Sequence, residues 1–183
     1  MDSVKLLLLA VKILWLISYA NAKECYLINA EDIKFVGDPN LVIVNITLRN
    51  NTHSDVDLQI KRKVLTVFMR MVITLVQGFN RKSVIFDKRF NMCESSKNPI
   101  SHFLSIYLSN IARRFFRNGR LCPLGPASFR ERNIPFNTNL LPLQIIYRPG
   151  YSVIINSTFS EDSKLATIAG YLYTQVKIVK TVC

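Results

Sequence analysis

The chain has 183 residues, of which 49% are hydrophobic and 20% are charged, and its formal net charge is +12. This length suits one ordinary domain with a sizeable core, and the hydrophobic fraction excludes a disordered chain. The positive charge favours acidic partners such as an anionic lipid, a glycan, a nucleic acid or an acidic protein surface, although it also serves solubility alone.

The first 22 residues predict a signal peptide. Lys5 supplies the positive start, Ile13–Ala20 supplies the hydrophobic part, and Ala20-Asn21-Ala22 matches the small-x-small pattern before a cleavage site. We therefore expect a secreted protein whose single mature domain covers residues 23–183, with 22 basic and 11 acidic side chains. An uncleaved membrane anchor is the alternative, but the length of the segment and Lys12 argue against it.

All four cysteines lie in the predicted mature chain, and an even number in an exported protein predicts two disulfides. Of the three possible pairings we favour Cys25–Cys183, because the termini of a domain often lie close together. Cys93–Cys122 is then the second bridge. The cysteine spacing and the presence of only two histidines do not resemble a zinc site, so we expect no metal and no cofactor.

Alternating residues predict a chain made mostly of strands. Nine segments are candidates, and they should give about seven or eight antiparallel strands: Cys25–Val36, Leu41–Arg49, Asp55–Lys61, Val64–Val76, Lys82–Met92, Ala127–Ile134, Leu143–Tyr147, Tyr151–Ser160 and Ala166–Val182. Val64–Val76 alternates little, so it is expected to be buried on both faces or bent between two sheets. Arg148-Pro149-Gly150 predicts a hairpin between its two neighbouring segments.

Three glycosylation signals predict which face of two strands points to solvent. They predict N-glycans at Asn45, Asn50 and Asn156, with Asn50 in a polar turn. A glycan must face solvent, so the residues that alternate with the asparagines should face the core. The inward residues are then Val44 and Ile46 beside Asn45, and Val153, Ile155 and Phe159 around Asn156. On Lys82–Met92 we expect Val84, Phe86, Phe90 and Met92 on one face, with Lys88 as an exception.

One helix is expected, over residues 99–117. Asn98 suits the N-cap, Pro99 the first helical position, and Gly119 the end of the helix. Its apolar face, which includes Leu104, Leu108 and Ile111, should dock on a sheet, either as ordinary core or as the edge of a ligand cavity. The predicted fold is therefore an immunoglobulin-like antiparallel β-sandwich or cup with one helix.

The chain also resembles a known family. The resemblance rests on Phe90-Asn-Met-Cys93, on Leu121-Cys122-Pro123-Leu-Gly125, on Leu140-Leu-Pro142 and on Pro149-Gly-Tyr151-Ser-Val153, in this order and spacing. It is similar to the large insect family of small secreted proteins that includes the CheB chemosensory proteins, and more distantly to ML-type lipid-recognition domains such as the ganglioside activator. The resemblance implies a β-cup whose sheets splay apart around a hydrophobic ligand, and a disulfide between the first and last cysteines.

No catalytic motif is present: the sequence has no Gly-x-Ser-x-Gly elbow, no HExxH helix and no phosphate-binding glycine loop, so we expect no enzyme. Two hypotheses remain. The first is a secreted binding protein for a hydrophobic small molecule or lipid, with chemosensation as the expected setting and a cell-surface receptor as an expected partner. The second is a secreted basic protein that binds an acidic receptor, glycan or membrane surface without a ligand. Nucleic-acid binding is not expected, because export and the missing motifs argue against it.

The first hypothesis names its site residues. The expected cavity is lined by Val44, Ile46, Phe68, Phe86, Leu104, Leu108, Ile111, Val153, Ile155 and Phe159, and Arg113 or Arg117 would bind an acidic head group at its mouth. The same apolar residues would also suit an ordinary packed core.

Overall fold

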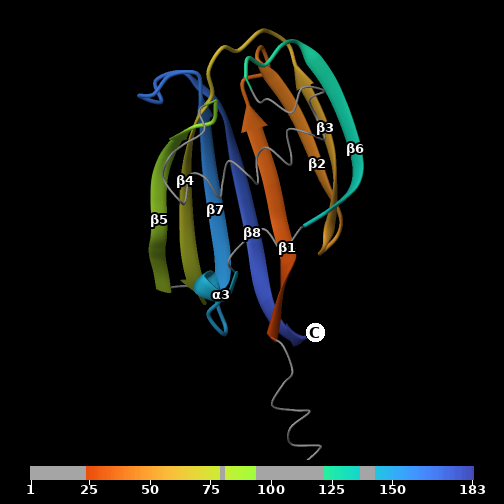
Figure 1. Ribbon diagram of the computed structural model, residues 1–183, viewed down its shortest axis with the longest axis vertical. Coiled ribbons are helices and arrows are strands. Elements are labelled where there is room, and N and C mark those ends of the chain that lie inside the picture. The colour runs from red at the N-terminus through yellow and green to blue at the C-terminus, as the bar shows by residue number, and fades with distance from the viewer. Residues whose placement is uncertain (1–23, 79–80, 94–121, 137–142) are drawn as a thin grey trace, which may run out of the picture.

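The computed structural model describes residues 24–78, 81–93, 122–136 and 143–183, which form two antiparallel β-sheets (Figure 1). The elements are β1 (Glu24–Gly37), β2 (Val42–Asn50), β3 (His53–Ile60), β4 (Phe68–Gln77), β5 (Arg81–Asn91), β6 (Ala127–Pro135), the helical turn α3 (Leu143–Ile146), β7 (Ser152–Ser160) and β8 (Ile168–Val182). This architecture confirms the predicted antiparallel β-sandwich. The predicted helix over 99–117 and the predicted signal peptide over 1–22 lie outside the described residues.

The first and last strands of the domain are neighbours. The five-stranded sheet has the order β1-β8-β7-β4-β5, and the three-stranded sheet has the order β2-β3-β6. β1 pairs with β8 from Glu24 opposite Val182 to Gly37 opposite Gly170. A disulfide joins Cys25 to Cys183 near one end of this ladder, with their Cα atoms 5.7 Å apart, as predicted.

The two sheets meet along β1 and β2, on the right in Figure 1. There the Ala30 amide of β1 donates a hydrogen bond of 2.7 Å to the Asn51 carbonyl in the turn between β2 and β3. The predicted second disulfide, Cys93–Cys122, is also present and joins the chain after β5 to the chain before β6. The far edges of the two sheets are therefore linked covalently at one end, although β5 and β6 do not pair with each other.

Strands β2 and β7 confirm the predicted alternation. On β2, Val44 and Ile46 are partly buried, while Asn45 and its same-face neighbours are exposed. On β7, Val153 is buried and Asn156 is exposed. The rule that a glycosylation signal marks the outward face therefore identifies the exposed face of both strands correctly.

Two predictions about strands are wrong in detail. β4 begins at Phe68 rather than Val64, because the chain bends between them and Val64 forms an isolated bridge with Leu124. On β5, a bulge between the pairs Ile73–Phe86 and Thr74–Val84 reverses the alternation. Val84 therefore points outward and is 60% exposed, instead of sharing a face with Phe86.

The segment Leu143–Tyr147 is a helical turn rather than a hairpin strand. β7 is already paired with β4 on one side and β8 on the other, so no edge is free for another strand. A helical turn instead brings Leu143, Ile146 and Tyr147 to one side of the segment, where all three pack into the core. The Tyr147 amide closes the turn by donating a 2.7 Å hydrogen bond to the Leu143 carbonyl.

Two hydrophobic clusters fill opposite parts of the sandwich. The large cluster gathers buried residues of β1, β4, β7, β8 and α3: Ile28, Ala30, Leu75, Leu143, Val153, Val176 and Ile178. The small cluster lies beside the Cys93–Cys122 disulfide and contains the buried residues Leu41, Val64 and Val67.

Phe35 covers a pair of facing glycines. Gly37 and Gly170 lie opposite each other on β1 and β8, and a Cβ atom on Gly170 would lie 2.5 Å from Cζ of Phe35. The Phe35 ring also lies 6.4 Å, between centroids, from that of Phe159 on β7. The absence of a side chain at position 170 therefore leaves room for the Phe35 ring against β8.

Gly170→Ala should destabilise the fold by about 1–3 kcal/mol, because the new methyl group forces Phe35 out of its site. Chemical denaturation followed by circular dichroism measures this loss. Gly125→Ala is the matched control, since a Cβ atom there meets nothing within 4 Å, and its stability should stay within about 0.5 kcal/mol of the parent. Equal stability of the two variants would contradict this account of Phe35.

Asp162 organises the loop between β7 and β8. Its carboxylate accepts hydrogen bonds from the amides of Thr167, Ala166 and Lys164, and from the Ser160 hydroxyl. These bonds, those of Thr167 and Ala166 first, lower the pKa of Asp162 to about 2. The ionised carboxylate thus replaces the backbone partners that this loop lacks.

Asp162→Asn should lower the melting temperature at pH 7, because the amide group cannot accept all of these bonds. A depressed folded pKa stabilises the protein above the unfolded value of about 3.9, and this stabilisation is lost as the pH falls through the folded value. The difference in melting temperature between parent and variant should therefore be constant above pH 4 and shrink towards pH 2. Asp38→Asn is the control, and a difference for Asp162→Asn that stays constant down to pH 2 would contradict the assignment.

Candidate functional site

The candidate site is the space between the two sheets. The inward residues in the middle of both sheets belong to neither hydrophobic cluster, and each keeps part of its surface accessible. On the three-stranded sheet they are Val44, Ile46, Val56 and Leu58, and on the five-stranded sheet they are Met71, Phe86, Phe90 and Leu172. These inward apolar side chains stay partly exposed, unlike the buried members of the two clusters.

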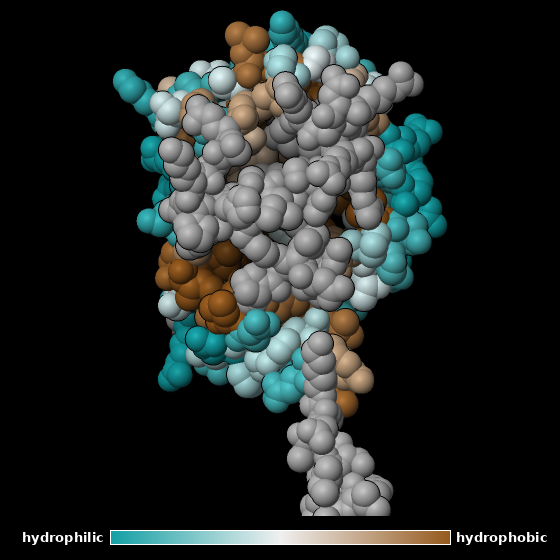
Figure 2. All heavy atoms as spheres, in the orientation of Figure 1, coloured by the Kyte–Doolittle hydropathy of each residue, from teal (hydrophilic) through white to brown (hydrophobic). Residues whose placement is uncertain are grey.

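The surface agrees with this uneven packing. On the face shown in Figure 2, hydrophobic residues gather at the lower left, over β5 and α3, while hydrophilic residues cover the right-hand side. Ile145 of α3 is 67% exposed, and Ile85 at the bulge of β5 is 44% exposed. On this face, the β5 side of the sandwich is therefore more apolar than the β2–β6 side.

The structure places most of the predicted cavity residues on the inward faces. Val44 and Ile46 face inward from β2, and Phe86 faces inward from β5 opposite Ile73. Phe86 also stacks on Phe90, with their ring centroids 6.0 Å apart. These side chains belong to neither hydrophobic cluster, and their role as a cavity wall stays a prediction.

Three predicted cavity residues serve the packed clusters instead. Ile155 packs against the large cluster and Phe159 against the small one, while Val153 is itself a buried member of the large cluster. Phe68 is a correction: it alternates with the buried Met69, so it points to the outer face of β4. β4 is apolar on both faces, and its pattern therefore does not indicate which residues face inward.

The remaining predicted site residues, Leu104, Leu108, Ile111, Arg113 and Arg117, lie outside the described residues. Their roles as cavity wall and head-group contacts stay predictions. Sequence reasoning missed Val56, Leu58 and Met71, although the alternation of Asp55–Lys61 was a sufficient signal for the first two.

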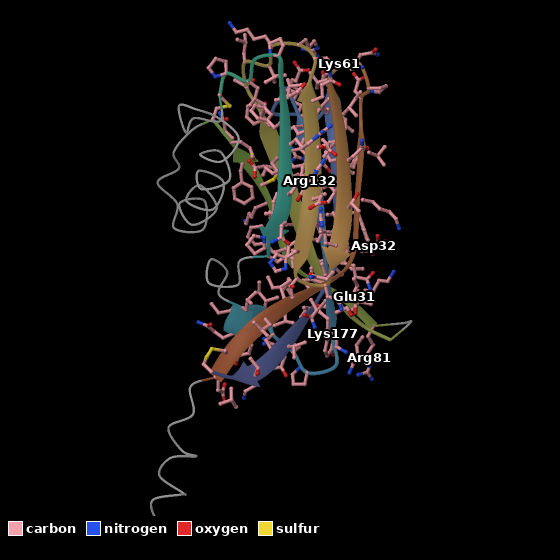
Figure 3. All side chains as sticks on the ribbon, turned by 90° about the vertical axis from the view of Figure 1, so that its right-hand side faces the viewer. Glu31, Asp32, Lys61, Arg81, Arg132 and Lys177 are labelled. Atoms are coloured by element: carbon pink, nitrogen blue, oxygen red, sulfur yellow. A yellow bond between two sulfur atoms is a disulfide. The ribbon has the colours of Figure 1, made fainter. Side chains whose placement is uncertain are left out.

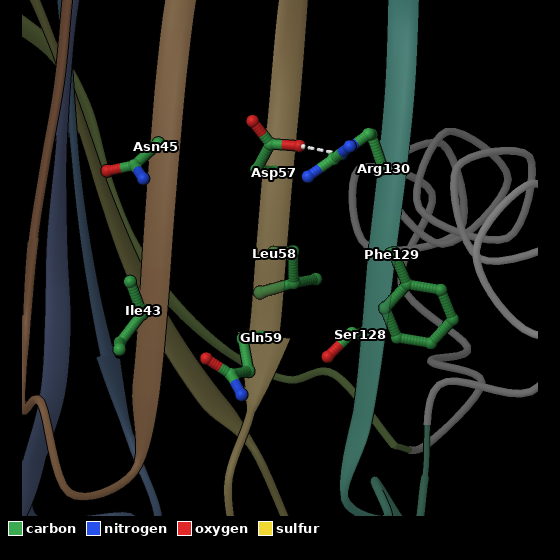
Figure 4. A pocket seen from close by; sticks show the side chains of 8 residues that line it. All are labelled: Ile43, Asn45, Asp57, Leu58, Gln59, Ser128, Phe129 and Arg130. Atoms are coloured by element: carbon green, nitrogen blue, oxygen red, sulfur yellow. Dashed lines mark hydrogen bonds and ion pairs between the residues drawn. The ribbon is translucent and has the colours of Figure 1, made fainter.

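A polar hollow lies on the outer face of the three-stranded sheet (Figure 4). Its walls include Ile43 and Asn45 of β2, Gln59 of β3, and Ser128 of β6. Asp57 lies in its middle and pairs with Arg130 at 3.0 Å and with Arg132 at 2.8 Å. This hollow is open and lined by paired charges, so it suits a solvated surface rather than a site for a hydrophobic molecule.

The carboxylates on this outer face are held ionised. Hydrogen bonds from Arg132 and then Arg130 lower the pKa of Asp57. A hydrogen bond from the Asn133 amide, with a further one from Arg49, lowers the pKa of Asp55. Both groups therefore act as fixed negative charges that neutralise arginines, and neither is placed as an acid or base for catalysis.

The glycosylation signals all lie at exposed positions. Asn45 and Asn156 are exposed within strands, and Asn50 is exposed as the last residue of β2, just before the turn to β3. The Asn50 side-chain oxygen accepts hydrogen bonds from the amide and the hydroxyl of Thr52, both at 2.9 Å. Glycosylation itself stays a prediction.

Neither a metal site nor a membrane span is found in the described part of the chain. No group of three or more His, Cys, Asp or Glu side chains among the described residues could hold a metal ion. Within the same residues, no helix is long and apolar enough to cross a membrane. No protein-family model matches the chain, and no curated protein is similar enough to count as a relative.

Proposed function

We propose that this protein is a secreted, non-enzymatic binding protein for a hydrophobic small molecule or lipid, which it holds between its two sheets. The observation that supports this proposal is the band of inward, partly exposed apolar side chains between the two hydrophobic clusters. Ligand sites are typically concave and lined mostly by such side chains. The predicted signal peptide and the two disulfides fit an extracellular protein.

The family resemblance supports the same proposal. A sandwich whose sheets meet along one side, β1 with β2, and do not pair along the other, β5 with β6, has the form expected of a β-cup. The resemblance to the CheB-related insect family adds chemosensation as the proposed setting, with a cell-surface receptor as a partner.

The neutral fluorescent probe N-phenyl-1-naphthylamine should bind the folded, delipidated protein and be displaced by lipid. Each buried CH₂ contributes about 0.8 kcal/mol, so a few methylenes already give a measurable affinity. Phe86→Glu should weaken binding about tenfold or more, because it places a charge on the cavity wall. Val84→Glu is the matched control: it lies on the same strand but points outward, so binding should stay within about twofold.

Circular dichroism must show that both variants are folded. Loss of probe affinity that is equal in the two variants would contradict the cavity, because only one of them changes an inward residue. Failure of the folded parent protein to bind any member of a broad lipid panel would remove the carrier proposal.

A second candidate, binding of an acidic surface, would then take its place. The loop between β3 and β4 carries Lys61, Arg62 and Lys63 in succession, and Leu65 at its tip is 68% exposed. Arg62 is paired with Glu161, while Lys61 lies at one end of the molecule, as Figure 3 shows. Basic side chains around an exposed apolar residue suit contact with an anionic membrane or receptor.

A further inference from the structure

One carboxylate points into the space between the sheets. On β6, Arg130 and Arg132 both reach Asp57 on the outer face of the sheet, so Glu131 between them points to the opposite, inner face. The register agrees, because Glu131 lies opposite Val56, which faces inward beside Leu58. Glu131 is partly buried, whereas its two arginine neighbours are exposed.

The Glu131 carboxylate has no polar partner in the described part of the protein. The arginines on either side of it are committed to Asp57, and the side chain makes no hydrogen bond or ion pair with a described residue. Its neighbours on the inner face are Val56 across the strand pair and Phe129 along β6. A carboxylate in such surroundings loses hydration without a compensating bond, and a ligand that donates a hydrogen bond would restore it.

We propose that Glu131 binds the polar head of the hydrophobic ligand and selects amphiphiles whose head group donates hydrogen bonds, with a protonated amine bound best. This inference rests on the proposed function and names the ligand class for the same site. A charge-assisted hydrogen bond is about twice as strong as a neutral one, and it strengthens where water is partly excluded. A hydroxyl head group would bind next best, and a carboxylate would be disfavoured. This order is opposite to the sequence-based prediction that Arg113 or Arg117 binds an acidic head group, and the two are alternatives for the same site.

A second inward charge, Lys88, provides a contrast. It lies opposite Met71 on β5, the edge strand of the other sheet, and it is exposed. Inward-pointing charges on edge strands also protect sheets from pairing with other chains, so an edge-protecting role is the alternative for Glu131. That alternative predicts that Glu131→Gln changes aggregation but leaves the choice of head group unchanged.

The test uses three molecules with the same twelve-carbon chain: dodecylamine, dodecanol and dodecanoate, each below its micelle concentration. They displace the neutral fluorescent probe N-phenyl-1-naphthylamine from the delipidated secreted protein at pH 7. The expected affinity order is amine, alcohol, carboxylate, with the amine at least tenfold tighter than the carboxylate. Glu131→Gln should weaken the amine about tenfold and change the alcohol by less than about threefold, while Lys88→Gln should leave the amine within about threefold.

Three results would contradict the proposed role of Glu131. Equal affinities of the three molecules for the parent protein would overturn the role of Glu131 while leaving the carrier proposal standing, and this comparison needs no variant. A folded Glu131→Gln protein that keeps the amine preference would do the same and would favour edge protection. If neither the probe nor any of the three molecules binds, the proposed function fails and the inference fails with it.

Discussion

The pairing of the first strand with the last one is the interaction on which the rest of the fold depends. β8 lies between β1 and β7, and β1 is the strand that approaches the three-stranded sheet. Loss of the β1–β8 ladder would therefore separate the two sheets as well as open the larger one. The Cys25–Cys183 disulfide closes a separation of 158 residues at the end of this ladder and, in the chain-entropy model, destabilises the unfolded chain by roughly 5 kcal/mol.

With the sheets joined on one side, the interior divides into packed and unpacked parts. The large cluster anchors β1, β4, β7, β8 and α3, and the small cluster seals the end beside the Cys93–Cys122 disulfide. Between them the inward side chains of β2, β3, β4 and β5 remain partly exposed. Stability and ligand binding can thus be served by different residues of the same sandwich, which is why Phe86 is a better probe of the site than Ile155.

Much of this arrangement was predictable where one face of a strand is polar. On β2, the glycosylation signal at Asn45 correctly identifies Val44 and Ile46 as inward, and the even number of cysteines together with the position of the termini gives both disulfides. Alternation fails on β4, because Phe68 and Met69 are both apolar while facing opposite sides.

Other features depend on tertiary structure that the sequence pattern does not contain. The β5 bulge shifts Val84 outward without any Gly or Pro to signal it, and α3 forms because β7 has no free edge. The inward position of Glu131 is visible only once Arg130 and Arg132 are known to share Asp57 on the outer face. The face on which an isolated charged residue of an edge strand lies can therefore be assigned only once the strand register is known.

The central claim is that the sandwich holds a hydrophobic molecule between its sheets. Native mass spectrometry of the protein secreted from insect cells tests this claim most directly, because a bound molecule adds its mass to the folded protein and is released by organic extraction. The account predicts a stoichiometric hydrophobic molecule that co-purifies with the parent protein and is reduced in the Phe86→Glu variant. A folded parent protein whose mass equals that of the polypeptide and its glycans, with nothing hydrophobic in the extract, would contradict it.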